Sequence, residues 1–293
     1  MHCSDMSPDA QKPHTVVGDL RVHEFDSVVL GESRTIAIWL PPTYHADDVS
    51  RFPVLYLHDG QNVFDNATAF GGEEWQVDET ATMLIRRGEV EPLIVVGVYN
   101  AGDARIDEYT PTVDATHGRG GRAEIHGRML VEELKPWIDA TYRTLPSAAS
   151  TALGGSSLGG LTTLHLGLRY YTAFGNLAVH SPSVWWDNRV VLRQVEGLTG
   201  KLPLRIWLDA GTAEGPAVIP DVRSLRDALV RNGWRLGHDL AYVEVEGAGH
   251  DERAWRARVA PMLRFLFPAR RRPLERTVRA LRRFRDLWRG TPT

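Results

Sequence analysis

The chain has 293 residues, of which 43% are hydrophobic and 24% charged, and its formal net charge at pH 7 is −3. These values are ordinary for a soluble globular enzyme with an ample core. Cys3 is the single cysteine, which excludes an intrachain disulfide and a cysteine-based metal site.

The N-terminal segment, residues 1–13, is polar and is predicted to be disordered. It contains Asp5, Pro8, Asp9 and Lys12 but no apolar run, so it does not have the pattern of a secretory signal. No segment of the sequence approaches the length of a membrane span. A cytoplasmic location is therefore expected.

Alternating strands and helices are predicted along the rest of the chain. Two β-rich segments, 16–29 and 34–40, come first and are joined by a turn at Gly31 and Glu32, as in a hairpin. Short apolar runs then alternate with helical patterns, which predicts a mostly parallel sheet with helices on both faces. We expect further strands at 54–57, 93–98, 151–154, 177–180, 204–208 and 240–245, and helices at 77–87, 124–142, 161–170, 222–232 and 252–267. No linker interrupts the pattern, so one domain is predicted over 14–268.

The C-terminal tail, residues 269–293, has a different composition. Its nine arginines stand against Glu275 and Asp286, a net charge of +7, which leaves −10 for the rest of the chain. Apolar residues recur in it at helical spacing, so a basic amphipathic helix is predicted. We favour docking of this tail on the acidic body over contact with a membrane surface, and we expect no nucleic-acid partner.

A GxSxG motif, centred on Ser157, lies between the strand predicted at 151–154 and the helix predicted at 161–170. In the sequence Gly155-Ser156-Ser157-Leu158-Gly159, a sharp strand-to-helix turn would expose the serine hydroxyl, and glycines would allow the close backbone approach. Ser157 is therefore a candidate nucleophile, although a plain Gly-Ser turn has the same letters.

A serine nucleophile needs a base, and four histidines follow Ser157. His165 falls inside a helix, and His238 precedes the last strand at the wrong end of the sheet. His180 ends a neighbouring strand and stays a candidate. His250 fits best, because it follows the last strand on a glycine-containing loop, where catalytic groups collect.

An acid is expected after the strand at 204–208 to orient the imidazole. Glu214 lies on the loop itself and can reach towards His250, whereas Asp209 sits at the strand end, where it could bind backbone amides instead. Asp221 follows further along. Spacing separates Glu214 from Asp209 only weakly.

An acyl-transfer site also needs N–H donors for the oxyanion. Leu158, directly after the nucleophile, supplies the first. The second is expected after the strand at 54–57, where Gly60 permits a close turn that aims the Gln61 N–H inward.

Taken together, these features resemble the putative esterase family of α/β-hydrolases, which includes enterochelin, feruloyl and acetylxylan esterases, S-formylglutathione hydrolases and mycolyltransferases. The resemblance extends over about 16–267 and is carried by the GxSxG motif, His58-Asp59-Gly60-Gln61-Asn62, Asp209-Ala210-Gly211-Thr212 and Gly249-His250-Asp251. It implies the α/β-hydrolase fold, and it favours Glu214 as the acid and Gln61 as the second oxyanion donor. The resemblance to enterochelin esterases is the strongest.

Two adjacent tryptophans, Trp185 and Trp186, follow the strand at 177–180. They are candidates for substrate binding, since an indole can wall a pocket and stack on a catechol or ferulate. Neighbouring strand residues face opposite ways, so we expect one to pack in the core and one to line the cleft.

The resulting prediction is a serine carboxylesterase that hydrolyses small-molecule esters, of which siderophore esters are favoured, with no metal or cofactor. Feruloyl or acetyl esters of carbohydrates and S-formylglutathione are alternative substrates. A binding or scaffold protein with a hydrolase fold and a basic tail is the alternative from another class, and an intact set of serine, histidine and acid argues against it.

Overall fold

A computed structural model describes residues 14–269 of the chain. The predicted disordered N-terminus and, apart from Ala269, the predicted basic tail lie outside the described residues.

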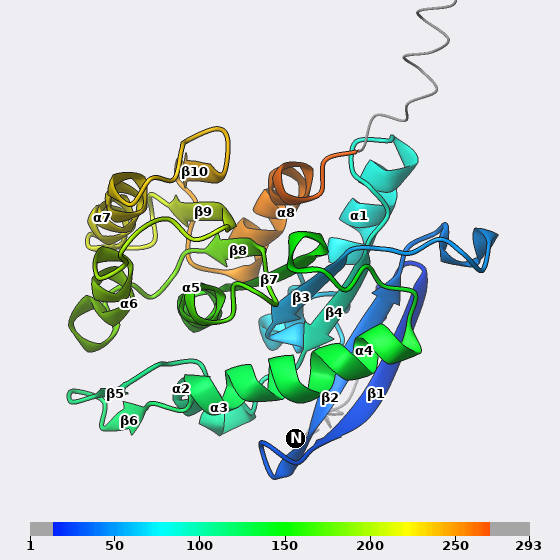
Figure 1. The fold of residues 1–293 in the computed structure, drawn as a ribbon, viewed down its shortest axis with the longest axis horizontal. Coiled ribbons are helices and arrows are strands. Elements are labelled where there is room, and N and C mark those ends of the chain that lie inside the picture. The colour runs from blue at the N-terminus through cyan, green and yellow to red at the C-terminus, as the bar shows by residue number, and fades with distance from the viewer. Residues whose placement is uncertain (1–13, 270–293) are drawn as a thin grey trace, which may run out of the picture.

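An eight-stranded sheet forms the centre of the described chain (Figure 1). Its strand order is β1-β2-β4-β3-β7-β8-β9-β10. β1 pairs antiparallel with β2, and β2 pairs antiparallel with β4, while the other neighbours are parallel. The strands of this sheet are β1 Asp19–Ser27, β2 Glu32–Leu40, β3 Val54–His58, β4 Ile94–Val98, β7 Thr151–Ser156, β8 Asn176–His180, β9 Arg205–Gly211 and β10 Leu240–Val245.

Helices cover both faces of the sheet. One face packs on α1 and α8, and the other packs on a long helical segment (α3, the π-helix η5 and α4) together with α5, α6 and α7. Within residues 14–269, no helix is both long and apolar enough to cross a membrane. The helices are α1 Val77–Arg86, α2 Arg105–Glu108, α3 Ala123–Arg128, η5 Met129–Leu134, α4 Lys135–Thr141, α5 Leu158–Arg169, α6 Trp186–Glu196, α7 Val218–Arg231 and α8 Glu252–Leu266, with short 3₁₀ turns at η1 Tyr44–Ala46, η2 Gly60–Asn62, η3 Phe70–Gly72, η4 Gly102–Ala104 and η6 Ala148–Ser150.

The central strands β3, β4, β7 and β8 are buried at every position because both of their faces are covered. In β3, Val54 and Tyr56 belong to the core on the α5 side, whereas Leu55 and Leu57 belong to the core on the α1 and α8 side. Successive strand residues point to opposite faces, so one short apolar run contributes to two cores. The predicted α/β-hydrolase fold, with its antiparallel N-terminal hairpin, is confirmed.

Three local features differ from the prediction. β9 runs to Gly211, three residues beyond the expected end, so Asp209 lies inside the strand. A helix that was not predicted, α6, begins at Trp186, and a two-stranded hairpin (β5 Val113–Asp114 and β6 Arg119–Gly120) stands apart from the main sheet. These segments lie around the candidate site.

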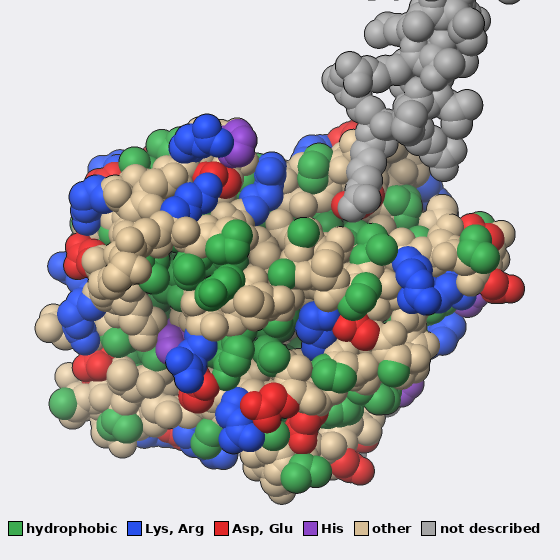
Figure 2. Space-filling model, in the orientation of Figure 1, with side chains coloured by type: hydrophobic (Ala, Val, Ile, Leu, Met, Phe, Trp, Pro, Cys, Tyr) green, Lys and Arg blue, Asp and Glu red, His purple; other side chains and the backbone are tan. Residues whose placement is uncertain are grey.

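The surface has mixed charge on the face seen in Figure 2. Lys and Arg side chains are interspersed with Asp and Glu there, while hydrophobic side chains gather towards the middle. This face therefore has no extended region of a single sign.

Candidate active site

Ser157 occupies the sharp turn between β7 and α5. Its backbone has φ 58° and ψ −121°, a strained conformation for a residue with a side chain. A Cβ on Gly155 would lie 2.9 Å from the carbonyl carbon of Gly159, and one on Gly160 would lie 2.7 Å from the oxygen of His180. The glycines therefore let the strand, the turn and the helix approach closely enough to expose the Ser157 hydroxyl.

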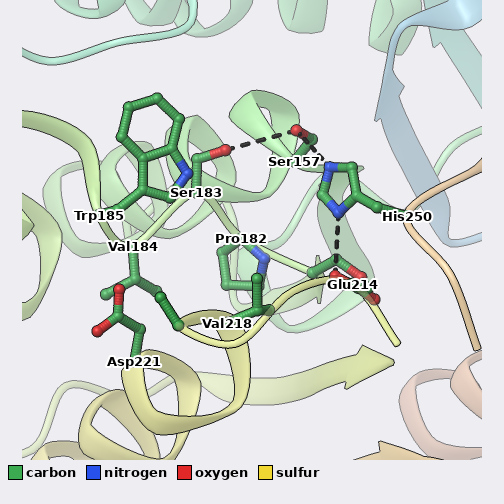
Figure 3. A pocket seen from close by; sticks show the side chains of 11 residues that line it. Ser157, Pro182, Ser183, Val184, Trp185, Glu214, Val218, Asp221 and His250 are labelled. Atoms are coloured by element: carbon green, nitrogen blue, oxygen red, sulfur yellow. Dashed lines mark hydrogen bonds and ion pairs between the residues drawn. The ribbon is translucent and has the colours of Figure 1, made fainter. Parts of the chain in front are cut away.

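A chain of contacts joins Ser157, His250 and Glu214 (Figure 3). The Ser157 Oγ lies 2.9 Å from His250 Nε2, and His250 Nδ1 lies 3.0 Å from Glu214 Oε2. The three residues follow β7, β9 and β10, so they meet at the carboxyl edge of the sheet. The His250 side chain is 38% exposed, whereas that of Glu214 is fully buried. The arrangement can transfer a proton from the hydroxyl to the imidazole.

The second carboxylate oxygen of Glu214, Oε1, is held by three donors. The Ser181 hydroxyl donates to it at 2.6 Å, Arg258 donates at 3.2 Å, and the Gly211 N–H also donates. Burial acts to raise the pKa of Glu214, but the hydrogen bonds from His250, Ser181 and Gly211 outweigh burial and hold the pKa below its usual value. Glu214 is thus kept ionised beside the imidazole.

Asp209, the alternative acid, contacts a different histidine. Its carboxylate lies 2.6 Å from His180 Nδ1 and accepts hydrogen bonds from Trp207 and Arg258. All of its carboxylate partners are buried side chains, and the backbone amides that were considered for it are not among them. His180, the alternative base, is fully buried. The structure therefore pairs these two alternatives with each other and not with Ser157.

The loop after β3, which carries Gln61, is held against the sheet. A Cβ on Gly60 would lie 2.4 Å from the carbonyl carbon of Gly97 in β4, so the loop approaches as closely as glycine allows. The Asp59 carboxylate binds Arg105 through two hydrogen bonds, at 2.6 and 2.7 Å. A Cβ on Gly159 would lie 3.3 Å from the Asp59 carboxylate, so this loop contacts the start of α5.

The two predicted oxyanion donors lie on these adjoining segments. Leu158 is the first residue of α5, where a backbone N–H has no carbonyl of its own helix to bind. Gln61 is in η2, and its side-chain oxygen accepts from the Asn100 N–H at 3.3 Å. Their role in binding an oxyanion remains a prediction.

A cavity of about 330 Å³ opens beside Ser157. Pro182, Val184, Trp185 and Val218 give it apolar walls, and its polar lining includes Ser183 and Asp221 (Figure 3). Its size suits part of a small organic ligand. Within residues 14–269, the carboxylates placed to hold a metal ion together are those of Glu74, Asp78 and Glu79, and none of them lines this cavity.

The adjacent tryptophans have different environments. Trp185 is 48% exposed and lines the cavity, whereas Trp186 is fully buried and donates its indole N–H to the Thr112 carbonyl. The ring of Trp186 packs against the segment 112–120, so Trp186 is the core tryptophan of the pair and does not line the cavity. Trp185 keeps a position from which it can contact a ligand.

Known esterases resemble this chain in sequence and in fold. The sequence profile of the family described as "Putative esterase" matches residues 27–266. The chain belongs to this esterase family. Among its relatives, the ferri-bacillibactin esterase BesA of Bacillus subtilis is 30% identical over 206 residues, which are 62% of this chain and 67% of BesA.

Two further relatives extend the comparison of this esterase. The endo-1,4-beta-xylanase/feruloyl esterase of Xylanibacter ruminicola is 27% identical over 259 residues, which are 85% of this chain and 31% of that protein. The crystal structure of the enterobactin esterase FES from Shigella flexneri, determined in the presence of enterobactin, matches with a TM-score of 0.70 at 23% identity and covers 90% of this chain and 62% of that one. The family and its esterase relatives support a hydrolase that acts on carboxylic esters.

Three residues of the esterase site were not found from the sequence. Ser183 Oγ lies 3.4 Å from Ser157 Oγ, and Ser181 and Arg258 bind Glu214. Ser181 and Ser183 follow β8, the strand next to β7. Their position after a strand beside the nucleophile could have indicated a place in the site. No sequence pattern distinguishes Arg258, because the chain has many arginines and Arg258 lies within a helix, α8.

Proposed function

We propose that the chain is a serine esterase that works through an acyl-enzyme. Ser157 Oγ attacks the ester carbonyl carbon while His250 Nε2 takes the hydroxyl proton. The ester C–O bond then breaks, and the imidazolium returns that proton to the departing alcohol. Water repeats the sequence on the acyl-serine and releases the acid. The observation that carries the proposal is the chain of contacts at 2.9 and 3.0 Å from Ser157 through His250 to Glu214.

Each other group has a defined task in this mechanism. Ionised Glu214 accepts the Nδ1–H of His250, which fixes the tautomer that presents a bare Nε2 to the serine and stabilises the imidazolium. The N–H groups of Leu158 and Gln61 donate to the carbonyl oxygen as it gains negative charge. Preorganised donors lower the activation free energy most when the charge that develops in the transition state is shielded from water.

Replacement of the nucleophile tests the mechanism directly. In Ser157→Ala, kcat/KM for a series of p-nitrophenyl esters is expected to fall by at least about 10⁴-fold, because no acyl-enzyme can form. The measurement is steady-state hydrolysis, with Ser183→Ala as the neighbouring serine for comparison. Equal turnover by wild type and Ser157→Ala would contradict the proposal and favour the scaffold alternative.

The favoured substrates are siderophore esters of the enterobactin type. The exposed indole of Trp185 beside the cavity suits an aromatic acyl group such as a catechol, and relatives named for siderophore substrates point the same way. A feruloyl ester would use the same indole, in line with another relative's name. S-formylglutathione and acetyl esters would leave the indole unused.

A substrate screen separates these classes. Ferric and iron-free enterobactin, methyl ferulate, an acetylated sugar and S-formylglutathione are compared by kcat/KM with the wild type and with Trp185→Ala. Aromatic acyl esters are expected to give the highest kcat/KM. Trp185→Ala should lower their kcat/KM by about 5- to 150-fold while sparing acetyl esters, since about 1–3 kcal/mol is lost with such a contact. A lead for S-formylglutathione, unchanged in Trp185→Ala, would reject the aromatic class.

A further inference from the structure

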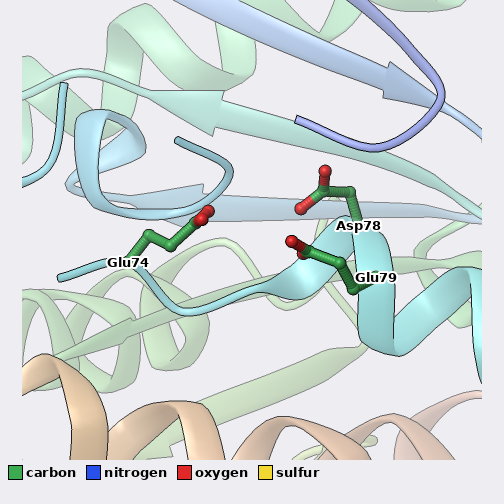
Figure 4. Close-up of side chains that lie close together, drawn as sticks. All are labelled: Glu74, Asp78 and Glu79. Atoms are coloured by element: carbon green, nitrogen blue, oxygen red, sulfur yellow. The ribbon is translucent and has the colours of Figure 1, made fainter. Parts of the chain in front are cut away.

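A group of three carboxylates lies away from the active site, at the start of α1. Glu74 precedes the helix, and Asp78 and Glu79 are in its first turn. Oxygens from all three lie within 4.8 Å of one another, and Glu74 and Asp78 are fully buried. Figure 4 shows the three carboxylates pointing towards one another.

Each carboxylate has one buried oxygen without a hydrogen-bond partner among the described residues: Glu74 Oε2, Asp78 Oδ1 and Glu79 Oε2. The other oxygens of the two fully buried residues are occupied. Thr15 donates its hydroxyl to Glu74 Oε1, and the Val17 N–H donates to Asp78 Oδ2 at 2.6 Å. The cluster thus offers three unused acceptors in a region shielded from water.

The protein's own charges do not account for this arrangement. A helix N-terminus favours the acidic side chains of Asp78 and Glu79, but Glu74 lies outside the helix and brings a third charge. Arg256, which lies near enough to lower the pKa of Glu74, forms its ion pair with Glu73. Buried ionised carboxylates without partners cost several kcal/mol each, so either a bound cation or protons must offset their charge.

We propose that Glu74, Asp78 and Glu79 bind one hard divalent cation of the Ca²⁺ or Mg²⁺ class. Oxygen-only donors select such ions, and Ca²⁺ in particular accepts carboxylates in flexible geometry with water completing the shell. The site contains no nitrogen or sulfur donor among these three residues, which distinguishes it from a zinc site.

The ion would join three segments of the chain. Thr15 and Val17 attach the N-terminal segment to two of its ligands, and Glu74 precedes Trp75, whose ring lies 5.9 Å from that of Trp255. Trp255 in turn lies 5.0 Å from the ring of His250. The cation is therefore structural and supports the aromatic residues behind His250 without contacting substrate.

Shared protons are the rival explanation. Burial raises the pKa of Glu74 to about 7 and, together with the neighbouring Glu79 carboxylate, raises that of Asp78 to about 8. If protons alone neutralise the cluster, replacement of a carboxylate by an amide should stabilise the fold in the absence of any ion. If a cation does so, the same replacement should remove a ligand.

The test uses the full chain after removal of metal with EDTA and dialysis. Calorimetric titration with Ca²⁺, and separately with Mg²⁺, is expected to show one saturable site with a Kd below about 1 mM, the weak end of protein calcium sites, and a higher Tm with the ion. Glu79→Gln and Glu74→Gln should weaken binding by at least about tenfold, because the charge of the ligand set tunes affinity. Asp48→Asn, in the exposed Asp47-Asp48 pair, should leave binding unchanged.

The wild-type titration tests cation binding even if a variant fails to fold. Absence of saturable binding of both ions below about 1 mM would overturn the proposal, as would equal affinity in wild type and Glu79→Gln. A higher Tm of Glu79→Gln in EDTA, with no effect of either ion on wild type, would assign the cluster to shared protons.

Discussion

Two buried carboxylates five positions apart, Asp209 and Glu214, have separate tasks. Glu214 contacts the imidazole of His250, while Asp209 binds His180 and the Arg258 guanidinium. Arg258 contacts both carboxylates, so it offsets part of the cost of burying two negative charges. On the proposed mechanism, Glu214 orients the base, while Asp209 binds only side chains of the core.

Amide substitutions should separate the two tasks. Glu214→Gln is expected to lower kcat by about 10³- to 10⁴-fold, because nothing then fixes the tautomer of the imidazole or balances its positive charge. It should also lower stability, since Arg258 loses one of its two carboxylate partners. Asp209→Asn should chiefly lower the free energy of unfolding, by about 3–5 kcal/mol, because it leaves buried charge unpaired. Kinetics and urea unfolding of both variants provide the check, and the opposite pattern would make Asp209 the acid.

At the residue scale, the sequence could place Ser157 and His250 because each has a local context: a glycine-flanked turn and a loop after the last strand. It could not decide between Glu214 and Asp209, since both follow the same apolar run and only their spatial partners differ. Ser181 and Arg258, which hold Glu214, are 33 and 44 residues away from it in sequence, and no local pattern links them.

Among the elements, the loop after β3 is tightly packed against the sheet. Asp59 adopts a left-handed conformation with φ 56°, and its ion pair with Arg105 fixes the loop from outside. Gly60 packs the loop directly against the backbone of Gly97. The two residues that precede Gln61 therefore hold the loop in place.

A methyl group at this contact should displace the loop. Gly60→Ala is expected to lower kcat by about 10²-fold, the cost of one oxyanion donor, and to lower Tm as well. Gly200→Ala is the matched control, since nothing lies within 4 Å of its added Cβ. An unchanged kcat in Gly60→Ala, measured with the same p-nitrophenyl ester, would remove Gln61 from the proposed mechanism.

Most elements could be predicted because apolar runs of strand length alternate with longer amphipathic segments. Helix α6 escaped prediction because Asp187, Asn188 and Arg189 all have positive φ, which interrupts helical backbone at its start. Val190 and Val191 then follow, and β-branched residues are weak helix formers. The small β5–β6 hairpin has two residues per strand, too few for any alternation to be visible.

For the whole molecule, buried acids link stability to pH. Burial opposes ionisation of Asp209 and Glu214, but His180 and Arg258 beside the first, and His250 and Ser181 beside the second, lower the pKa of each carboxyl in the folded state. A folded-state pKa below the unfolded value, near 4, adds stability that is complete above the unfolded value. That stability is lost as pH falls through the folded pKa.

Urea unfolding at several pH values measures this link. The free energy of unfolding is expected to fall as pH is lowered from 5 to about 3, and the fall should be smaller in Asp209→Asn and Glu214→Gln than in wild type. Asp48→Asn, at an exposed position, should follow the wild-type curve. Parallel curves for all four proteins would show that the buried carboxylates do not set the acid sensitivity.

Helix α8 has a consequence for the order in which activity can appear. His250 stands just before it, and Trp255 and Arg258, which donate to the Ser181 hydroxyl that holds Glu214, lie within it. On the proposed mechanism, a chain growing from its N-terminus has its nucleophile long before its base and before the supports of its acid. A nascent chain is therefore expected to be inert towards esters until α8 has docked, so the packing of this helix sets the onset of hydrolysis.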